Sequence, residues 1–491
     1  MIRCRCLFAL LLCSSFAFAQ GNTAQHSKTT LATHLLVTTS SPAAREHFER
    51  AMRYFEGYDL KQTLADLREA EKSDPDFAQA LILISHLTRD PAEQSATRSR
   101  AKQLAAKVSP GEKLLIRWMA EAQENDYLPA IAAMNDLLAM FPADQRVAFM
   151  AGGWLNSQQR YEQAVFVLEK AVALHPDYPA ALNNLAYAYA YTGAFEKAFN
   201  AMDRYVAFEP DEPNPHDSYG ELLRMDGKFE AALEQYRMSV RIDPNFGSEV
   251  GIADTYALMG KEQEAREEYE RAIVFASSRS DKIQYQLQAA MTWVRDNNVK
   301  RAEKALSEIA KDAHAASLGK WEAESYRIAA MYEPTYKPAL KSLQAAQHAL
   351  QDHEISASDR DEELSRVLRV LATRSAESAD MKTAVEALNQ LSVMADSSRS
   401  QVIQLSYHGA AGAVLVTQGN FVDAISHLQE DADDPLSLQL LVKAYTRTGA
   451  ADQAQAATAK LSALNLPTAE QALVVPSFRA SLLTQAGNAQ H

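Results

Sequence analysis

The stretch 214–227 reads NPHDSYGELLRMDG and places His216, Asp217 and Ser218 side by side. These are the three residue types of a hydrolase triad, in which a carboxylate orients a histidine base that activates a serine hydroxyl. A triad needs its side chains within hydrogen-bond distance of one another, whereas neighbours on one helix point about 100° apart. Their chemistry therefore depends on the element that carries them.

Other signatures of catalysis or cofactor binding are absent from the sequence. The twelve histidines include no H-E-x-x-H pair, and His348 and His353 miss the i, i+4 spacing of a helical metal pair. Neither G-x-S-x-G nor G-x-G-x-x-G occurs, and no glycine–lysine pair belongs to a phosphate-binding loop. We therefore expect a protein that is not an enzyme, with no catalytic residue, metal ion or cofactor.

The N-terminus has the pattern of a secretory signal peptide. Arg3 and Arg5 precede an apolar run, and a small-x-small motif ends at Ala19. We expect residues 1–19 to be removed and the protein to be exported to the periplasm or secreted. The apolar run is too short to cross a membrane and no later run approaches that length, so no membrane span is expected.

All three cysteines lie in this N-terminal segment, at Cys4, Cys6 and Cys13. The mature chain would have no disulfide and no thiolate ligand or nucleophile, which suits an oxidising compartment. Lipidation at Cys13 is an open alternative, although Leu12 stands where a lipoprotein normally has a small residue.

The chain is acidic, with 49 basic and 63 acidic residues and a net charge of -14. Without Arg3 and Arg5 the balance is 47 against 63, or -16. Such a charge disfavours nucleic acid and anionic membrane surfaces, which attract basic patches. The 491 residues exceed what one compact core holds, so several domains or a solenoid are expected.

A repeat with a period of 34 residues runs through the middle of the chain. Five columns of residue types keep this step: the prolines Pro142, Pro176, Pro210 and Pro244, the glycines Gly193 and Gly227, the aromatics Tyr161, Phe195 and Phe229, the alanines Ala164, Ala198 and Ala232, and the small residues Gly152, Ala186 and Gly220. The pattern predicts two helices per unit, with small residues where the helices touch and a proline after the second.

These markers resemble the tetratricopeptide repeat family, most clearly over 111–279. The resemblance implies an all-α fold, a right-handed α-solenoid of about twelve helix-turn-helix pairs. We expect a flexible lead over 20–42 and an N-terminal array over 44–350. A linker or hinge over 351–364 would join it to a C-terminal array over 365–491, whose last helix covers the exposed end.

Within this pattern, 214–227 begins the first helix of a unit. Asn214 is a plausible N-cap and Pro215 a plausible first helical residue. His216, Asp217 and Ser218 would then occupy the first turn, where they cannot converge. We expect structural roles for them rather than catalysis.

In this family the first helices line a concave groove, and the resemblance assigns groove positions to particular residues. These are Asn183, Asn184, Tyr187, Tyr191, Asp217, Ser218, Glu221, Arg224 and Asp254. The expected function is a non-enzymatic scaffold that binds a protein or extended peptide, and the acidic groove favours a neutral to basic partner. A glycan-binding or secretion-machinery role is the alternative. Tyr187 and Tyr191 could also be packing residues, and Tyr189 is expected to be one.

Overall fold

A computed structural model describes residues 33–276, 278–352 and 354–488 of the protein. The described residues belong to one compact unit. The predicted signal peptide, its three cysteines and the first part of the flexible lead lie outside the described residues.

The described residues form α-helices joined by short turns, with one 3₁₀ turn at Ala105–Lys107 and no strand. The helices are α1 (Pro42–Glu56), α2 (Leu60–Ser73), α3 (Ala78–Leu87), α4 (Pro91–Leu104), α5 (Pro110–Gln123), α6 (Tyr127–Met140), α7 (Gln145–Ser157), α8 (Tyr161–Leu174), α9 (Pro179–Tyr191), α10 (Phe195–Phe208), α11 (Pro213–Met225), α12 (Phe229–Ile242), α13 (Glu249–Leu258), α14 (Glu262–Phe275), α15 (Arg279–Arg295), α16 (Val299–Ala315), α17 (Gly319–Tyr332), α18 (Tyr336–Asp352), α19 (Ala357–Glu377), α20 (Met381–Ser397), α21 (Gln401–Thr417), α22 (Phe421–Glu430), α23 (Pro435–Thr448), α24 (Ala451–Ala463) and α25 (Ala469–Asn488).

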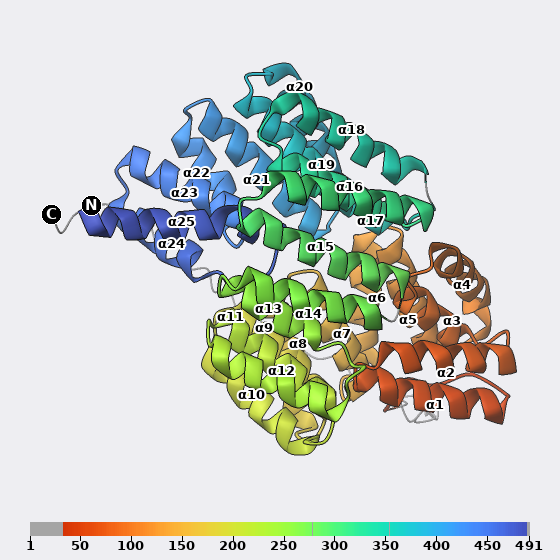
Figure 1. Ribbon diagram of the computed structural model, residues 1–491. Coiled ribbons are helices and arrows are strands. Elements are labelled where there is room, and N and C mark those ends of the chain that lie inside the picture. Colours follow the sequence, from red (N-terminus) through yellow and green to blue (C-terminus); the bar gives the residue numbers. More distant parts are fainter. Residues whose placement is uncertain (1–32, 277, 353, 489–491) are drawn as a thin grey trace, which may run out of the picture. The chain divides into compact units, whose positions relative to one another are not determined.

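Helices that follow one another in the sequence pack side by side, from the α1–α2 pair to the α23–α24 pair (Figure 1). The prediction of an all-α helical-repeat solenoid is thereby confirmed for the described residues. An isolated pair cannot bury its apolar stripe, so each pair also packs against the next one.

The repeat markers coincide with the ends of the helices. Four second helices, α6, α8, α10 and α12, end two residues before Pro142, Pro176, Pro210 and Pro244 respectively. Proline has no backbone N–H to donate and cannot continue a helix. Helix starts are marked as well: Ser109 and Glu112 form a reciprocal capping box at α5, with Pro110 as its first residue.

The turn inside each pair uses a left-handed backbone conformation. Gly193 and Gly227 have φ of +78° and +76°. Glycine adopts this conformation without the steric cost that a Cβ atom brings. Other pairs place Gln159 or Ala379 there, at φ of 55° and 61°, so the turn survives without glycine.

Small residues lie where the two helices of a pair touch. A Cβ atom added to Gly152 of α7 would meet the Leu168 side chain of α8 at 2.5 Å. One added to Gly220 of α11 would meet the Tyr236 ring of α12 at 3.0 Å. Four further repeat positions have no exposed surface, namely Ala164, Ala186, Ala198 and Ala232.

The described part of the predicted flexible lead packs against the repeats. The Leu35 backbone N–H donates to the Asp144 carboxylate at 2.7 Å, and that of Thr38 donates to Glu112 at 2.8 Å. The Thr38 hydroxyl donates to the other Glu112 oxygen at 2.6 Å. Contrary to the expectation for 20–42, residues 33–41 are therefore an extended segment held by carboxylates at the starts of α5 and α7.

Later repeats contact earlier ones at the turns within pairs. The Asn125 side chain donates to Asp361, which lies 236 residues away in the sequence, and accepts from Ser398. The Tyr127 hydroxyl donates to Glu362. The end of the predicted linker, residues 357–364, thus lies in the first turns of α19, beside α5 and α6.

The last helix, α25, packs against α15, α23 and α24. Within the described ranges, no helix has the length and hydropathy that crossing a bilayer requires.

Candidate functional site

The helix that carries His216, Asp217 and Ser218 starts earlier than the sequence suggested. α11 begins at Pro213 after Glu212, not at Pro215 after Asn214. Proline is favoured in the first helical turn, and two prolines compete for that place here. Asn214 is instead buried, and its side-chain amide donates to the Tyr205 hydroxyl at 2.8 Å.

His216 and Ser218 each bond to groups outside a triad. The His216 Nδ1 atom lies 2.7 Å from the Gln235 amide oxygen of α12, and its Nε2 lies 3.3 Å from the Pro210 carbonyl. The Ser218 hydroxyl donates to Asn214 at 3.4 Å. No serine–histidine–carboxylate chain forms among these residues. His216 joins α11 to α12, and the Ser218 bond stays within α11.

The predicted groove residues are joined in a row across the first helices of successive pairs. The Tyr187 hydroxyl of α9 donates to Glu221 of α11 at 2.7 Å. Arg224 donates to Glu221 at 3.1 Å and to Asp254 of α13 at 2.9 Å. The Tyr269 hydroxyl of α14 donates to the other Asp254 oxygen. We call Tyr187, Glu221, Arg224, Asp254 and Tyr269 the inner polar row.

Burial gives the inner polar row its electrostatic character. Arg224 is 3 % exposed and Asp254 is 6 % exposed. Burial lowers the pKa of Arg224, but Tyr236, Asp254 and Glu221 raise it by more, so the guanidinium stays charged. A charge buried this deeply needs its partners, because an unpaired one would lose its hydration without compensation.

Asp217, beside the row, is a carboxylate with no ion pair among the described residues. Burial raises its pKa to about 6, and the charges of Glu221 and Glu249 add to that rise. A hydrogen bond from Ser248 and the Arg224 charge oppose it. Asp217 and Glu221 are both partly exposed, so the predicted groove presents negative charge to a ligand at α11.

The two asparagines at the start of the predicted groove are buried by other parts of the chain. The Tyr58 hydroxyl, from the turn after α1, donates to the Asn184 side-chain oxygen at 2.7 Å. The Asn184 amide group donates to the Phe149 carbonyl at 3.2 Å. Asn183 is 2 % exposed, and its side-chain oxygen has no partner among the described residues. At Asn183 and Asn184 the predicted groove is therefore covered by other parts of the chain and is not accessible to a partner.

Tyr191 combines packing with exposure. Its ring stacks on Tyr161 of α8, with centroids 4.5 Å apart and planes 10° from parallel. Tyr187 and Tyr191 are both partly exposed. The packing role that the sequence left open for Tyr191 thus has direct support. Tyr191 follows Tyr187 by four residues, so both lie on the same side of α9.

Sequence reasoning missed a hollow on the opposite side of the repeats. A cavity of about 660 Å³ is lined by residues of α8, α9 and α10, Tyr189 among them. The Tyr189 hydroxyl donates to Glu169 at 2.6 Å, and the Lys197 ammonium lies 5.1 Å from the ring centre. Tyr189 is half-buried and packs against the hydrophobic core, in line with the packing role that its repeat position predicted.

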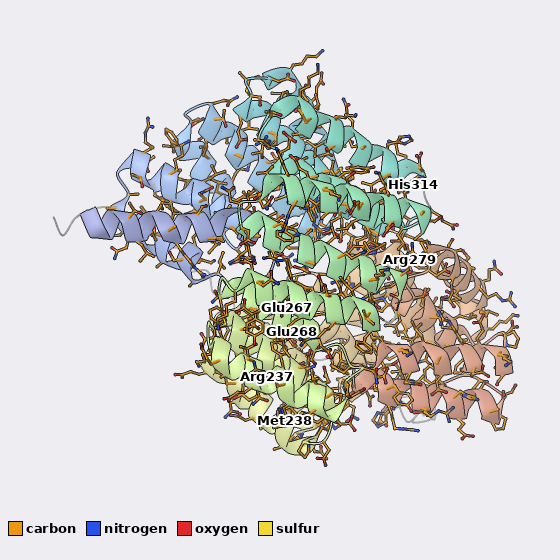
Figure 2. The ribbon with its side chains drawn as sticks, in the orientation of Figure 1. Arg237, Met238, Glu267, Glu268, Arg279 and His314 are labelled. Carbon is orange, nitrogen blue, oxygen red and sulfur yellow. The ribbon has the colours of Figure 1, made fainter. Side chains whose placement is uncertain are left out.

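The same side of the next repeats is covered by charged groups. Lys228 lies over the Phe199 ring and Lys261 over the Tyr256 ring. Figure 2 shows Arg237 and Met238 on α12 and Glu267 on the neighbouring α14. Because cations cover these ring faces, they are poor platforms for stacking a sugar.

No group of three or more metal-ligating side chains comes together within the described ranges. The side chains of the inner polar row fit hydrogen bonding and charge recognition, and no residue pair in it has the arrangement of a nucleophile and its base.

Comparison with known proteins supports the repeat assignment. The tetratricopeptide repeat family model matches residues 155–222, which include most of the predicted groove. The sequence matches no curated protein at a significant level.

Solved structures with similar folds have low sequence identity to this chain. The crystal structure of the APC/C hetero-tetramer Cut9–Hcn1 is 15 % identical, with a TM-score of 0.43, over 87 % of this chain and 79 % of that one. The yeast Tom70 structure is 13 % identical, with a TM-score of 0.41, over 83 % and 96 %. The MamA structure is 21 % identical, with a TM-score of 0.28, over 34 % and 95 %.

Proposed function

We propose, from the premise that this chain carries tetratricopeptide repeats, that it is a scaffold which holds an extended polypeptide along the inner faces of α9, α11 and α13. Such repeats support a role in protein interaction. The contact surface we assign is the partly exposed set Tyr187, Tyr191, Asp217 and Glu221.

The observation that carries this proposal is the unneutralised carboxylate at Asp217. Its raised pKa means that the folded protein holds this negative charge at a cost, with Glu221 and Glu249 nearby. A lysine or arginine side chain placed there would relieve that repulsion. A neutral to basic partner segment therefore suits this surface, and tyrosine edges supply rigid contact area beside it.

The protein's own N-terminal segment illustrates how these repeats hold an extended chain. Residues 33–41 donate backbone N–H groups to Glu112 and Asp144, and Leu35 lies close to Gly111 and Phe141. Carboxylates at the starts of first helices thus bind a main chain, and a small residue makes room for a side chain. A partner segment would use the same chemistry on the inner face.

We further propose that the protein acts after export, because the pattern of residues 1–19 is that of a signal peptide. A fusion of residues 1–40 to a reporter that is active only outside the cytoplasm would test this. Deleting residues 1–19 should abolish reporter activity, whereas replacing Ala17 and Ala19 by bulky residues should keep the activity but leave a larger, uncleaved protein. An unchanged size after the replacement, or full activity after the deletion, would contradict the proposal.

Peptide binding can be measured with matched inner and outer variants. Fluorescence anisotropy with basic, neutral and acidic peptide pools should show the tightest binding for the basic pool. The double variant Asp217→Asn, Glu221→Gln should lose at least about tenfold in affinity, which is 1.4 kcal/mol. The control Glu267→Gln, Glu268→Gln on α14 should bind as the wild type does. Preference for the acidic pool, or equal losses in both variants, would contradict the proposal.

A further inference from the structure

Exposed apolar side chains gather on the outer faces of three consecutive second helices, α6, α8 and α10. Phe166 of α8 is 74 % exposed, and Leu128 of α6 is 61 % exposed. The last residues of the three helices, Met140, Leu174 and Phe208, share one repeat position and are exposed as well. Apolar side chains that gather on a surface in this way are typical of a protein interface.

The same helices carry little charge. Asp136 is the one charged residue of α6, and the acidic and basic residues of α10 balance. By contrast, half of the residues of α14 are glutamate or arginine. Because the chain has a net charge of -14, two copies of it repel each other least where acidic side chains are few.

A hollow lies next to the exposed ring of Phe166, on the other side of α8. The groove that α6, α7 and α8 form is lined by Phe166 and Val167, and its volume is about 100 Å³. The equivalent groove of α8, α9 and α10 has Asn200 and Ala201 at these positions, and its volume is about 660 Å³. One repeat further, Gln235 takes the place of Ala201. The small side chain of Ala201 thus leaves room that larger residues take up in the neighbouring repeats.

We infer that the outer face of α6, α8 and α10 binds a second copy of this chain, with Phe166 of each copy in the hollow of the other. A two-fold symmetric interface must be self-complementary, because the same surface meets itself. This face meets that condition, since it presents both a projecting ring and a hollow with apolar lining from Val172 and Leu185. Aromatic side chains and few charges are also typical of the core of such an interface.

This surface lies on the opposite side of the repeats from Tyr187 and Glu221. The inference therefore neither supports nor depends on the proposed function, and a dimer would leave the inner face free for a polypeptide.

Light scattering coupled to size-exclusion chromatography measures self-association of the full chain over a series of concentrations. A reductant excludes disulfides through the N-terminal cysteines. The wild type should have the mass of two chains and fall to the mass of one chain on dilution. Phe166→Glu should raise the dissociation constant of the dimer by at least about tenfold, because it brings a charge into the hollow.

Val274→Glu is the matched control for this variant. Val274 is 77 % exposed, close to the value for Phe166, but it lies on the charged helix α14. Its replacement should leave the dissociation constant of the dimer unchanged. A wild type that has the mass of one chain at every concentration, or equal losses in the two variants, would overturn the inference.

A mixing experiment tests whether the ring enters the hollow. Phe166→Ala removes the ring and keeps the hollow, whereas Ala201→Gln fills the hollow with the residue that α12 has at that position and keeps the ring. Each variant alone should be monomeric where the wild type is a dimer. An equimolar mixture should regain dimer, because one ring and one hollow remain to meet. A mixture that stays monomeric, although both variants keep the wild-type melting temperature, would contradict the placement of Phe166 in the hollow.

Discussion

Arg224 shows at the residue scale how the inner face is held together. It bonds to Glu221 on its own helix and to Asp254 on the next first helix, and it is almost wholly buried. Deleting one member of a buried charged pair costs more than deleting an exposed one, because the remaining charge has lost its water.

Replacing Arg224 with methionine should therefore destabilise α11–α14 by roughly 3–5 kcal/mol. The control Arg237→Met removes an exposed arginine of α12 and should cost less than about 1 kcal/mol. Hydrogen exchange over residues 213–275 measures both changes locally. Equal protection in the two variants would mean that Arg224 does not hold these repeats together.

Asp217 should make the stability of the folded protein depend on pH in a defined direction. Its pKa is raised from 3.8 to about 6, so the folded protein binds this proton more tightly than the unfolded chain. The stability from this proton is fully present below about pH 4 and is lost as pH rises through 6. Asp217→Asn should leave stability unchanged near pH 4 and raise it by roughly 1–3 kcal/mol at pH 8.

Denaturant unfolding of the wild type and Asp217→Asn at several pH values measures this difference. The surface variant Glu267→Gln should show no comparable trend. An Asp217→Asn protein that is less stable than the wild type at pH 8, with the difference vanishing toward pH 4, would mean that Asp217 is ion-paired in the folded protein, against the contacts described above.

The helix pair is the unit whose geometry follows most directly from the sequence. The proline, glycine and alanine columns mark the ends, the turn and the contact of the two helices, and these positions take those places in the structure. Such features are local, because each depends on backbone conformation or on residues within one unit.

Ala198 tests the contact within one pair. It is fully buried on α10, so Ala198→Arg should overpack the contact with α9 and cost more than the roughly 1–3 kcal/mol of one or two extra methylenes. Asn200→Arg, at an exposed position of the same helix, should change the thermal midpoint little. An unchanged midpoint for Ala198→Arg would contradict the helix-pair assignment there.

Contacts between distant repeat units could not be predicted from the sequence. Nothing local pairs Tyr58 with Asn184, because superhelical packing decides which units meet. For the same reason the groove residues could be placed on one face, but not divided into buried and accessible members. Burial of Asn183 by other parts of the fold removes it from the binding surface.

At the scale of the whole described unit, repeats far apart in the sequence are coupled. A simple solenoid has contacts only between neighbouring repeats, so its stability is nearly a sum of local terms. Here Asn125 and Tyr127 bond to α19, and the Asn465 amide donates to the Met225 carbonyl. Destabilising substitutions in late repeats should therefore also lower the stability of early repeats.

The central claim is that the inner face of the first helices contacts a polypeptide partner. Site-specific photocrosslinking in the host's own extract tests it most directly, with a photoreactive amino acid replacing Tyr191 on the inner face of α9 or Met238 on the exposed side of α12 (Figure 2). We expect a protein adduct from the Tyr191 position, competed by basic peptides, and none from the Met238 position. Adducts only from Met238, or an adduct at Tyr191 that basic peptides do not compete, would contradict it.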